Sequence, residues 1–319
     1  MNVRAASFAL FASIGISLAP AAELPLASAE SMGGLMRAWS DSFTAQHPAT
    51  PARLILRARF AAELLVPRGR GEVRVAPFPR ELFPAERARF VELAGAAPVL
   101  VPVATGSRAT KGGTHAIAIF VHERNPLSRL SLAQLREILA HDGRIATWGQ
   151  LGLGGEWAAK KIAPHGMAIR RETGHPPGIV NFLEHRLLAG RAWRDSITAH
   201  TDIAGGPQAL ELIVRAVAAD EAALGYSGFA YAQPGARTLL LAETEAGPFF
   251  AGTADEITRR DYPLTRTIYL CLAPPADVTA RAFVRHVLSP AGQRAIAADA
   301  QKFFPLPPAA LAAARAQLN

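Results

Sequence analysis

Short apolar runs alternate with longer amphipathic segments along almost the whole chain. A short apolar run bounded by turn residues is typical of a buried strand, whereas apolar residues three and four positions apart form one face of a helix. The alternation of the two favours an α/β architecture. The clearest strand signal is the uncharged run 116–121 (AIAIFV). Further strands are predicted at 24–27, 54–56, 73–76, 99–103, 224–227 and 267–272, with another ending at 168–170.

The amphipathic segments predict helices whose ends are marked by capping residues and prolines. The helix predicted over residues 31–46 ends before Pro48. Ser131 is well suited to cap a helix over 131–139. In a helix over 85–93 we expect Glu86 to be exposed, together with its neighbouring arginines. Other helices are predicted at 179–188, 207–218, 276–288 and 291–300.

The N-terminal segment has the three parts of a secretory signal: Arg4, the apolar residues 5–19, and the small residues Ala19 and Ala21 at a cleavage site. The alternative is a membrane anchor, but the apolar run falls short of the ~20 residues that span a bilayer. Cleavage at a second small-residue site, residues 27–29, would remove the first predicted strand. We therefore expect export to the periplasm, with cleavage near Ala21.

Composition narrows the function classes. The 34 basic and 26 acidic residues give a net charge of +8, which favours an anionic ligand. Because the basic residues are scattered, we expect no nucleic acid partner. Cys271 is the single cysteine and lies in an apolar strand, so it suits a core position better than a nucleophilic one. We find neither a metal-binding histidine spacing nor a Gly-x-Ser-x-Gly motif, and we expect a protein that is not an enzyme.

Several segments, taken in order, resemble the phosphate-binding protein family of bacterial uptake systems. Each is weak alone, but together they extend over nearly the whole mature chain. The segments are 27–32 (ASAESM), 116–121 (AIAIFV), 125–135 (NPLSRLSLAQL), 145–151 (IATWGQL), 224–228 (LGYSG), 262–266 (YPLTR) and 287–293 (VLSPAGQ).

The resemblance implies an α/β, two-lobed periplasmic binding protein fold of type II, with two crossover strands between the lobes. Lobe one would combine residues 22–108 with 230–319, and lobe two would be residues 109–229. The ligand would be phosphate or a related oxyanion held in the cleft, without a cofactor or metal. The expected partner of this monomer is an ABC transporter permease or a membrane sensor. The alternative is a binding fold that has lost phosphate and serves as a partner module or binds another small ligand.

A tetrahedral oxyanion is bound by backbone N–H groups, hydroxyl groups and an arginine fork. In the first predicted lobe, the Ser31 hydroxyl and the Met32 backbone N–H are candidate donors, although Ser31 also suits an ordinary helix cap. Arg80 is a candidate that either faces the cleft or pairs with a carboxylate.

In the second predicted lobe, the family places an arginine shortly before Ser-Gly-Thr. The corresponding candidates in this chain are Arg170, Arg171, Thr173 and Gly174. Two departures weaken the case for phosphate. Prolines follow at 176–177 and remove two N–H donors, and the loop at 57–63 lacks the Gly and Ser residues that relatives carry.

Overall fold

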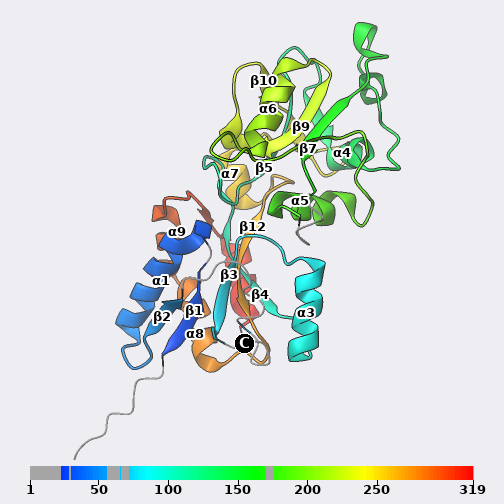
Figure 1. Ribbon diagram of the computed structural model, residues 1–319. Coiled ribbons are helices and arrows are strands. Elements are labelled where there is room, and N and C mark those ends of the chain that lie inside the picture. Colours follow the sequence, from blue (N-terminus) through cyan, green and yellow to red (C-terminus); the bar gives the residue numbers. More distant parts are fainter. Residues whose placement is uncertain (1–22, 29, 56–64, 66–71, 170–175, 319) are drawn as a thin grey trace, which may run out of the picture.

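The computed structural model describes residues 23–28, 30–55, 65, 72–169 and 176–318. Two α/β lobes, each with its own sheet, lie one above the other, and the chain passes between them twice (Figure 1). The α/β architecture predicted from the alternation of apolar runs is therefore present. The N-terminal segment, the loop at 57–63 and the run Arg170–Gly174 lie outside the described residues.

The first lobe has a six-stranded sheet in the order β13-β4-β12-β3-β1-β2, in which β12 is antiparallel to β3 and β4. Its strands are β1 (Leu24–Ala27), β2 (Ala52–Ile55), β3 (Val75–Phe78), β4 (Val99–Thr105), β12 (Thr267–Leu272) and β13 (Phe304–Pro305). Its helices are η1 (Glu30–Met32), α1 (Gly33–Gln46), α3 (Pro84–Ala94), α8 (Val278–Val287), α9 (Pro290–Ala298) and α10 (Pro308–Ala316).

The second lobe has a five-stranded sheet in the order β10-β5-β9-β7-β8 and a two-stranded pair, β11-β6. Its strands are β5 (Ile117–His122), β6 (Arg129–Ser131), β7 (Ala163–Met167), β8 (Thr198–His200), β9 (Ala223–Gly228), β10 (Ala236–Thr238) and β11 (Leu240–Ala242). Its helices are α4 (Leu132–Leu139), α5 (Gly178–Leu183), α6 (Ala209–Ala219) and α7 (Ala254–Arg259), and its short turns are η2 (Trp148–Leu151), η3 (Gly155–Trp157), η5 (Glu184–Leu188) and η6 (Phe229–Tyr231).

Strand pairing and core packing show where the chain returns from the second lobe to the first. The first crossing joins β4 to β5, and the second leads from α7 into β12. The boundary predicted at 229/230 is wrong, because β10 pairs with β5, and Leu241, Ile257 and Tyr262 belong to the second-lobe core. Residues 230–262 therefore lie with the second lobe.

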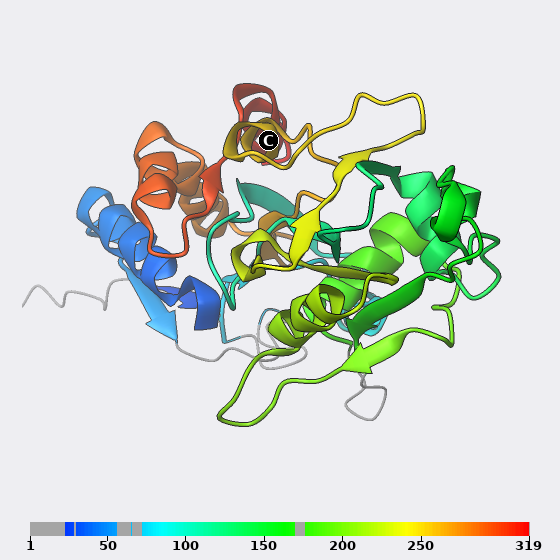
Figure 2. The ribbon, with the colours of Figure 1, turned by 90° about the horizontal axis from the view of Figure 1, so that it is seen from above.

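The first-lobe core is formed by helices from both ends of the chain. Helix α1 packs against α8 and α9, visible as the blue and orange helices on one side of Figure 2. Trp39 is completely buried, and its Nε1 donates to the Gly292 carbonyl oxygen at 3.0 Å. A buried indole N–H needs such a partner, so this bond fixes α1 against α9.

Local capping explains where several helices begin. Ser131 caps α4 as predicted, because its hydroxyl oxygen accepts the N–H of Gln134. Helix α6 begins at Ala209, two residues later than predicted, since the Asp202 carboxylate accepts the Ala209 N–H at 2.8 Å. Helix α1 begins at Gly33 after a short 3₁₀ turn that contains Ser31, and its N-cap residue, Met32, makes no side-chain capping bond.

Candidate functional site

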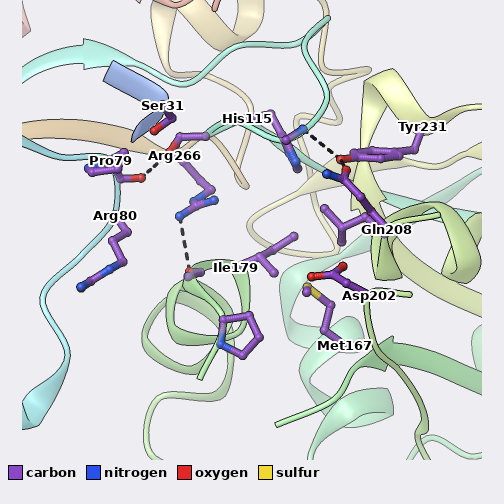
Figure 3. A pocket seen from close by; sticks show the side chains of 16 residues that line it. Ser31, Pro79, Arg80, His115, Met167, Ile179, Asp202, Gln208, Tyr231 and Arg266 are labelled. Carbon is purple, nitrogen blue, oxygen red and sulfur yellow. Dashed lines mark hydrogen bonds between the residues drawn. The ribbon is translucent and has the colours of Figure 1, made fainter. Parts of the chain in front are cut away.

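A cavity of about 280 Å³ lies between the two lobes, where β1, β3 and β7 end. In α/β folds, ligands bind beyond the carboxyl ends of the strands, and this cavity has that position. The first lobe and the crossings contribute Ser31, Pro79, Arg80, Thr114, His115 and Arg266 to its lining, and the second lobe contributes Met167, Ile179, Asp202, Gln208, Leu210 and Tyr231 (Figure 3).

A buried cation of this cavity is Arg266, which lies on the return crossing just before β12 and is only 5% exposed. Its Nη2 lies 3.4 Å from the Gly178 carbonyl oxygen, a long contact. Its Nε is buried and has no hydrogen-bond partner among the residues that the structure describes. Burying a guanidinium that lacks both a counter-ion and a partner for one of its donors is costly, so Arg266 is a candidate ligand group for an anion.

The positive charge of Arg266 is offset by a neighbouring carboxylate that does not hydrogen-bond it. Burial lowers the pKa of Arg266, and the Glu81 carboxylate opposes that effect. Glu81 does not hydrogen-bond Arg266, and its Oε2 is itself buried without a partner within the described part of the chain. Within the described residues, Arg266 therefore has no carboxylate in direct contact, and its charge is available to a ligand anion in the cavity.

His115 lies beside Arg266 on the first crossing and is 2% exposed. Burial, and then the positive charge of Arg266, lower its pKa to about 4. Nδ1 of this neutral ring lies 3.2 Å from the Ala116 carbonyl oxygen, which can only accept, so the ring proton is on Nδ1. Gly228, the last residue of the LGYSG segment, makes room for the ring: a Cβ there would lie 2.6 Å from it.

The lowered pKa of His115 predicts a specific loss of stability in acid. An unfolded histidine titrates near 6.5, so between pH 6.5 and 4 the unfolded chain binds a proton that the folded chain does not. Stability should therefore fall as the pH drops through this range, by up to roughly 1.4 kcal/mol per pH unit from this residue. Urea unfolding of the parent and of His115→Gln at several pH values measures the difference.

Comparing the pH dependence of stability between the parent and His115→Gln isolates the contribution of His115 from that of the other histidines. His165, His200 and His286 also have lowered pKa values, but they are the same in both proteins. The variant should show a flatter dependence below pH 6.5. An identical dependence in both proteins would contradict the assignment.

Arg80 lines the cavity, but its guanidinium is already paired. Nη1 and Nη2 each donate to one carboxylate oxygen of Glu86, both at 2.7 Å, and Nη1 also donates to the Glu81 carbonyl oxygen. The guanidinium stacks on the Phe83 ring, 3.8 Å from its centroid. The prediction that Glu86 is exposed is wrong, because this pairing buries its carboxylate. Arg80 therefore both lines the cavity and pairs with a carboxylate, and its role as a ligand group stays a prediction.

Ser31 and Met32, the two candidate donors of the first lobe, have side chains in different surroundings. Ser31 lines the cavity from η1, at the end of β1. The Met32 side chain packs into the first-lobe core, 1% exposed, so only its backbone N–H remains a candidate. For both residues, the role of ligand group stays a prediction. The same holds for Arg170, Arg171, Thr173 and Gly174, which fall outside the described residues.

The sequence interpretation did not select the residues that form most of the second-lobe wall. Tyr231 accepts the Gly112 N–H at 3.0 Å and donates to Gln208, which ties the first crossing to the start of α6. Asp202 brings a carboxylate to the cavity, and Ile179 brings an apolar side chain. Arg266 is the last residue of the YPLTR segment, whose likeness to the family indicates scaffold and does not single out its arginine.

The chain is 26% identical over 290 residues to the phosphate-binding protein PstS of Pseudomonas aeruginosa, in an alignment covering 87% of this chain and 81% of that protein. The resemblance to phosphate-binding proteins is confirmed. No family model matches the chain.

Solved structures of low sequence identity share the fold. PstS from Borrelia burgdorferi superposes with a TM-score of 0.58 at 14% identity, covering 90% of this chain and 99% of that one. An ABC-type phosphate transport receptor from Vibrio cholerae gives 0.55 at 17% identity, covering 88% and 99%. With the two sheets and two crossings, these matches confirm the two-lobed periplasmic binding protein fold.

Proposed function

We propose that this protein is a periplasmic solute-binding protein that captures phosphate or a related oxyanion in the cavity between its lobes and delivers it to an ABC transporter or a membrane sensor. The observation that carries the proposal is the buried Arg266, which lines that cavity and whose Nε has no hydrogen-bond partner among the described residues. An oxyanion would supply the missing charge and acceptors. The curated relative, a phosphate-binding protein, supports the same class of ligand.

The proposed site contains binding groups in place of a nucleophile. Ser31 is proposed as a hydroxyl donor from the first lobe, and the predicted donors at 170–174 would add to it from the second.

Burial raises the pKa of the Cys271 thiol far above its usual range, so it is not a thiolate at neutral pH. Among the described residues, no helix is long and apolar enough to cross a membrane.

Titration calorimetry of the purified mature protein tests the proposal. Phosphate, sulfate, molybdate and simple phosphonates should be titrated separately at neutral pH, and at least one should release or absorb heat with a saturable 1:1 isotherm. A thermal melt in parallel establishes that the protein is folded. A folded protein that binds none of these anions would overturn the proposal.

A further inference from the structure

The cavity is larger than a bare tetrahedral oxyanion requires. Its volume is about 280 Å³. At roughly 30 Å³ for each water molecule in the liquid, that space corresponds to about nine waters, whereas an inorganic oxyanion has only four oxygens around one central atom. The cavity therefore leaves room for further atoms beside an anionic head.

Part of the cavity wall is apolar and gives an inorganic anion nothing to bind. Met167, Ile179 and Leu210 line the second-lobe side. In Figure 3, Ile179 extends into the space between Arg266 and Asp202. Ligand pockets combine a few polar groups that orient the ligand with apolar walls that bury its carbon atoms. This wall therefore fits a short aliphatic chain attached to the anion.

The far side of the cavity carries the opposite charge. Asp202 is exposed, and one of its carboxylate oxygens accepts the Ala209 N–H. A carboxylate in this position repels a bare dianion but attracts an ammonium group. Across the cavity, the described residues thus present a cation at Arg266, apolar side chains next to it, and an anion at Asp202.

We propose that the ligand of this cavity is a short aminoalkyl oxyanion, with a phosphonate-type head at Arg266, a chain of two or three carbons along Ile179 and Met167, and an ammonium group at Asp202. The inference rests on the proposed function, since it assigns the anion to the same site. It names the class of organic oxyanion and places phosphate as a weaker ligand.

Calorimetry with three probes tests the aliphatic chain and the ammonium group separately. Ethylphosphonate should bind about tenfold more tightly than phosphate, because each buried methylene is worth a factor of about four. The compound 2-aminoethylphosphonate should bind a further two- to fivefold more tightly, as expected for an ion pair at an exposed carboxylate. Phosphate binding as tightly as either phosphonate would overturn this inference and leave the proposed function standing. Absence of binding by all three to the folded protein would overturn this inference, and would overturn the proposed function as well only if sulfate and molybdate also fail to bind.

The variant Asp202→Asn tests the contact with the ammonium group. Asparagine keeps the oxygen that accepts the Ala209 N–H, so the start of α6 stays capped. The ratio between the affinities for 2-aminoethylphosphonate and ethylphosphonate should fall to about one, while ethylphosphonate binds at least as tightly as before. Asp195→Asn, which removes a second-lobe carboxylate outside this cavity, is the matched control and should keep the parent ratio. An unchanged ratio in Asp202→Asn would overturn the assigned contact.

Discussion

Replacing Arg266 with glutamine should weaken oxyanion binding by a factor between about ten and about one hundred. A hydrogen bond from a charged donor contributes roughly 1.5–3 kcal/mol, and 1.4 kcal/mol is tenfold in affinity. Glutamine keeps a polar side chain at the return crossing but removes the charge and the guanidinium fork. Arg266→Lys should recover part of the affinity, because it restores the charge without the planar pair of donors. Calorimetry with the anion that binds the parent protein measures each variant.

Arg108→Gln is the matched control for Arg266. Arg108 also lies on a crossing and is partly buried, but it donates to the Gly252 carbonyl oxygen and stacks on Phe229, and it does not line the cavity. Its loss should leave the dissociation constant within about twofold of the parent. If Arg266→Gln bound the anion as tightly as the parent, the anion would not lie at Arg266.

The parts of the fold that the sequence predicted best are those in which local pattern and tertiary context agree. β1 and β12 have the predicted limits, because each is a short apolar run buried in the first-lobe sheet. The start of α4 after Ser131 was also predictable, since capping depends on one hydroxyl and one nearby N–H. The pairing of strands that are far apart in the chain was not predictable from local pattern. β10 is a three-residue, half-buried strand, and only its pairing with β5 assigns it to the second lobe.

The candidate site was predicted less well than the fold, for a physical reason. Sequence patterns identify residue types that can bind an anion, but whether an arginine is free depends on its neighbours in space. Arg80 pairs with the carboxylate of Glu86, six residues further along the chain. The helical pattern alone predicts Glu86 on an exposed face. Arg266 lies in a segment that resembles the family scaffold, and only its burial without an ion-pair partner among the described residues distinguishes it.

Arg80→Met should lower the free energy of unfolding by about 3 kcal/mol and leave oxyanion affinity within about twofold of the parent. The side chains of Arg80 and Glu86 are only 21% and 9% exposed, so removing the guanidinium leaves a largely buried carboxylate without its charged partner. Breaking a buried pair from one side typically costs 3–5 kcal/mol. The Phe83 N–H, which donates to Glu86 at 2.9 Å, compensates only in part. Urea unfolding gives the stability, and calorimetry gives the affinity.

The double variant Arg80→Met/Glu86→Gln separates loss of the pair from loss of the arginine itself. Glutamine keeps an oxygen to accept the Phe83 N–H but carries no charge, so the buried carboxylate is no longer left alone. The double variant should therefore recover most of the stability that Arg80→Met loses, although stacking on the Phe83 ring is lost in both. A double variant no more stable than Arg80→Met would contradict the paired assignment. A large loss of anion affinity in both variants would return Arg80 to the binding site, because the pairing with Glu86 would then orient a ligand group.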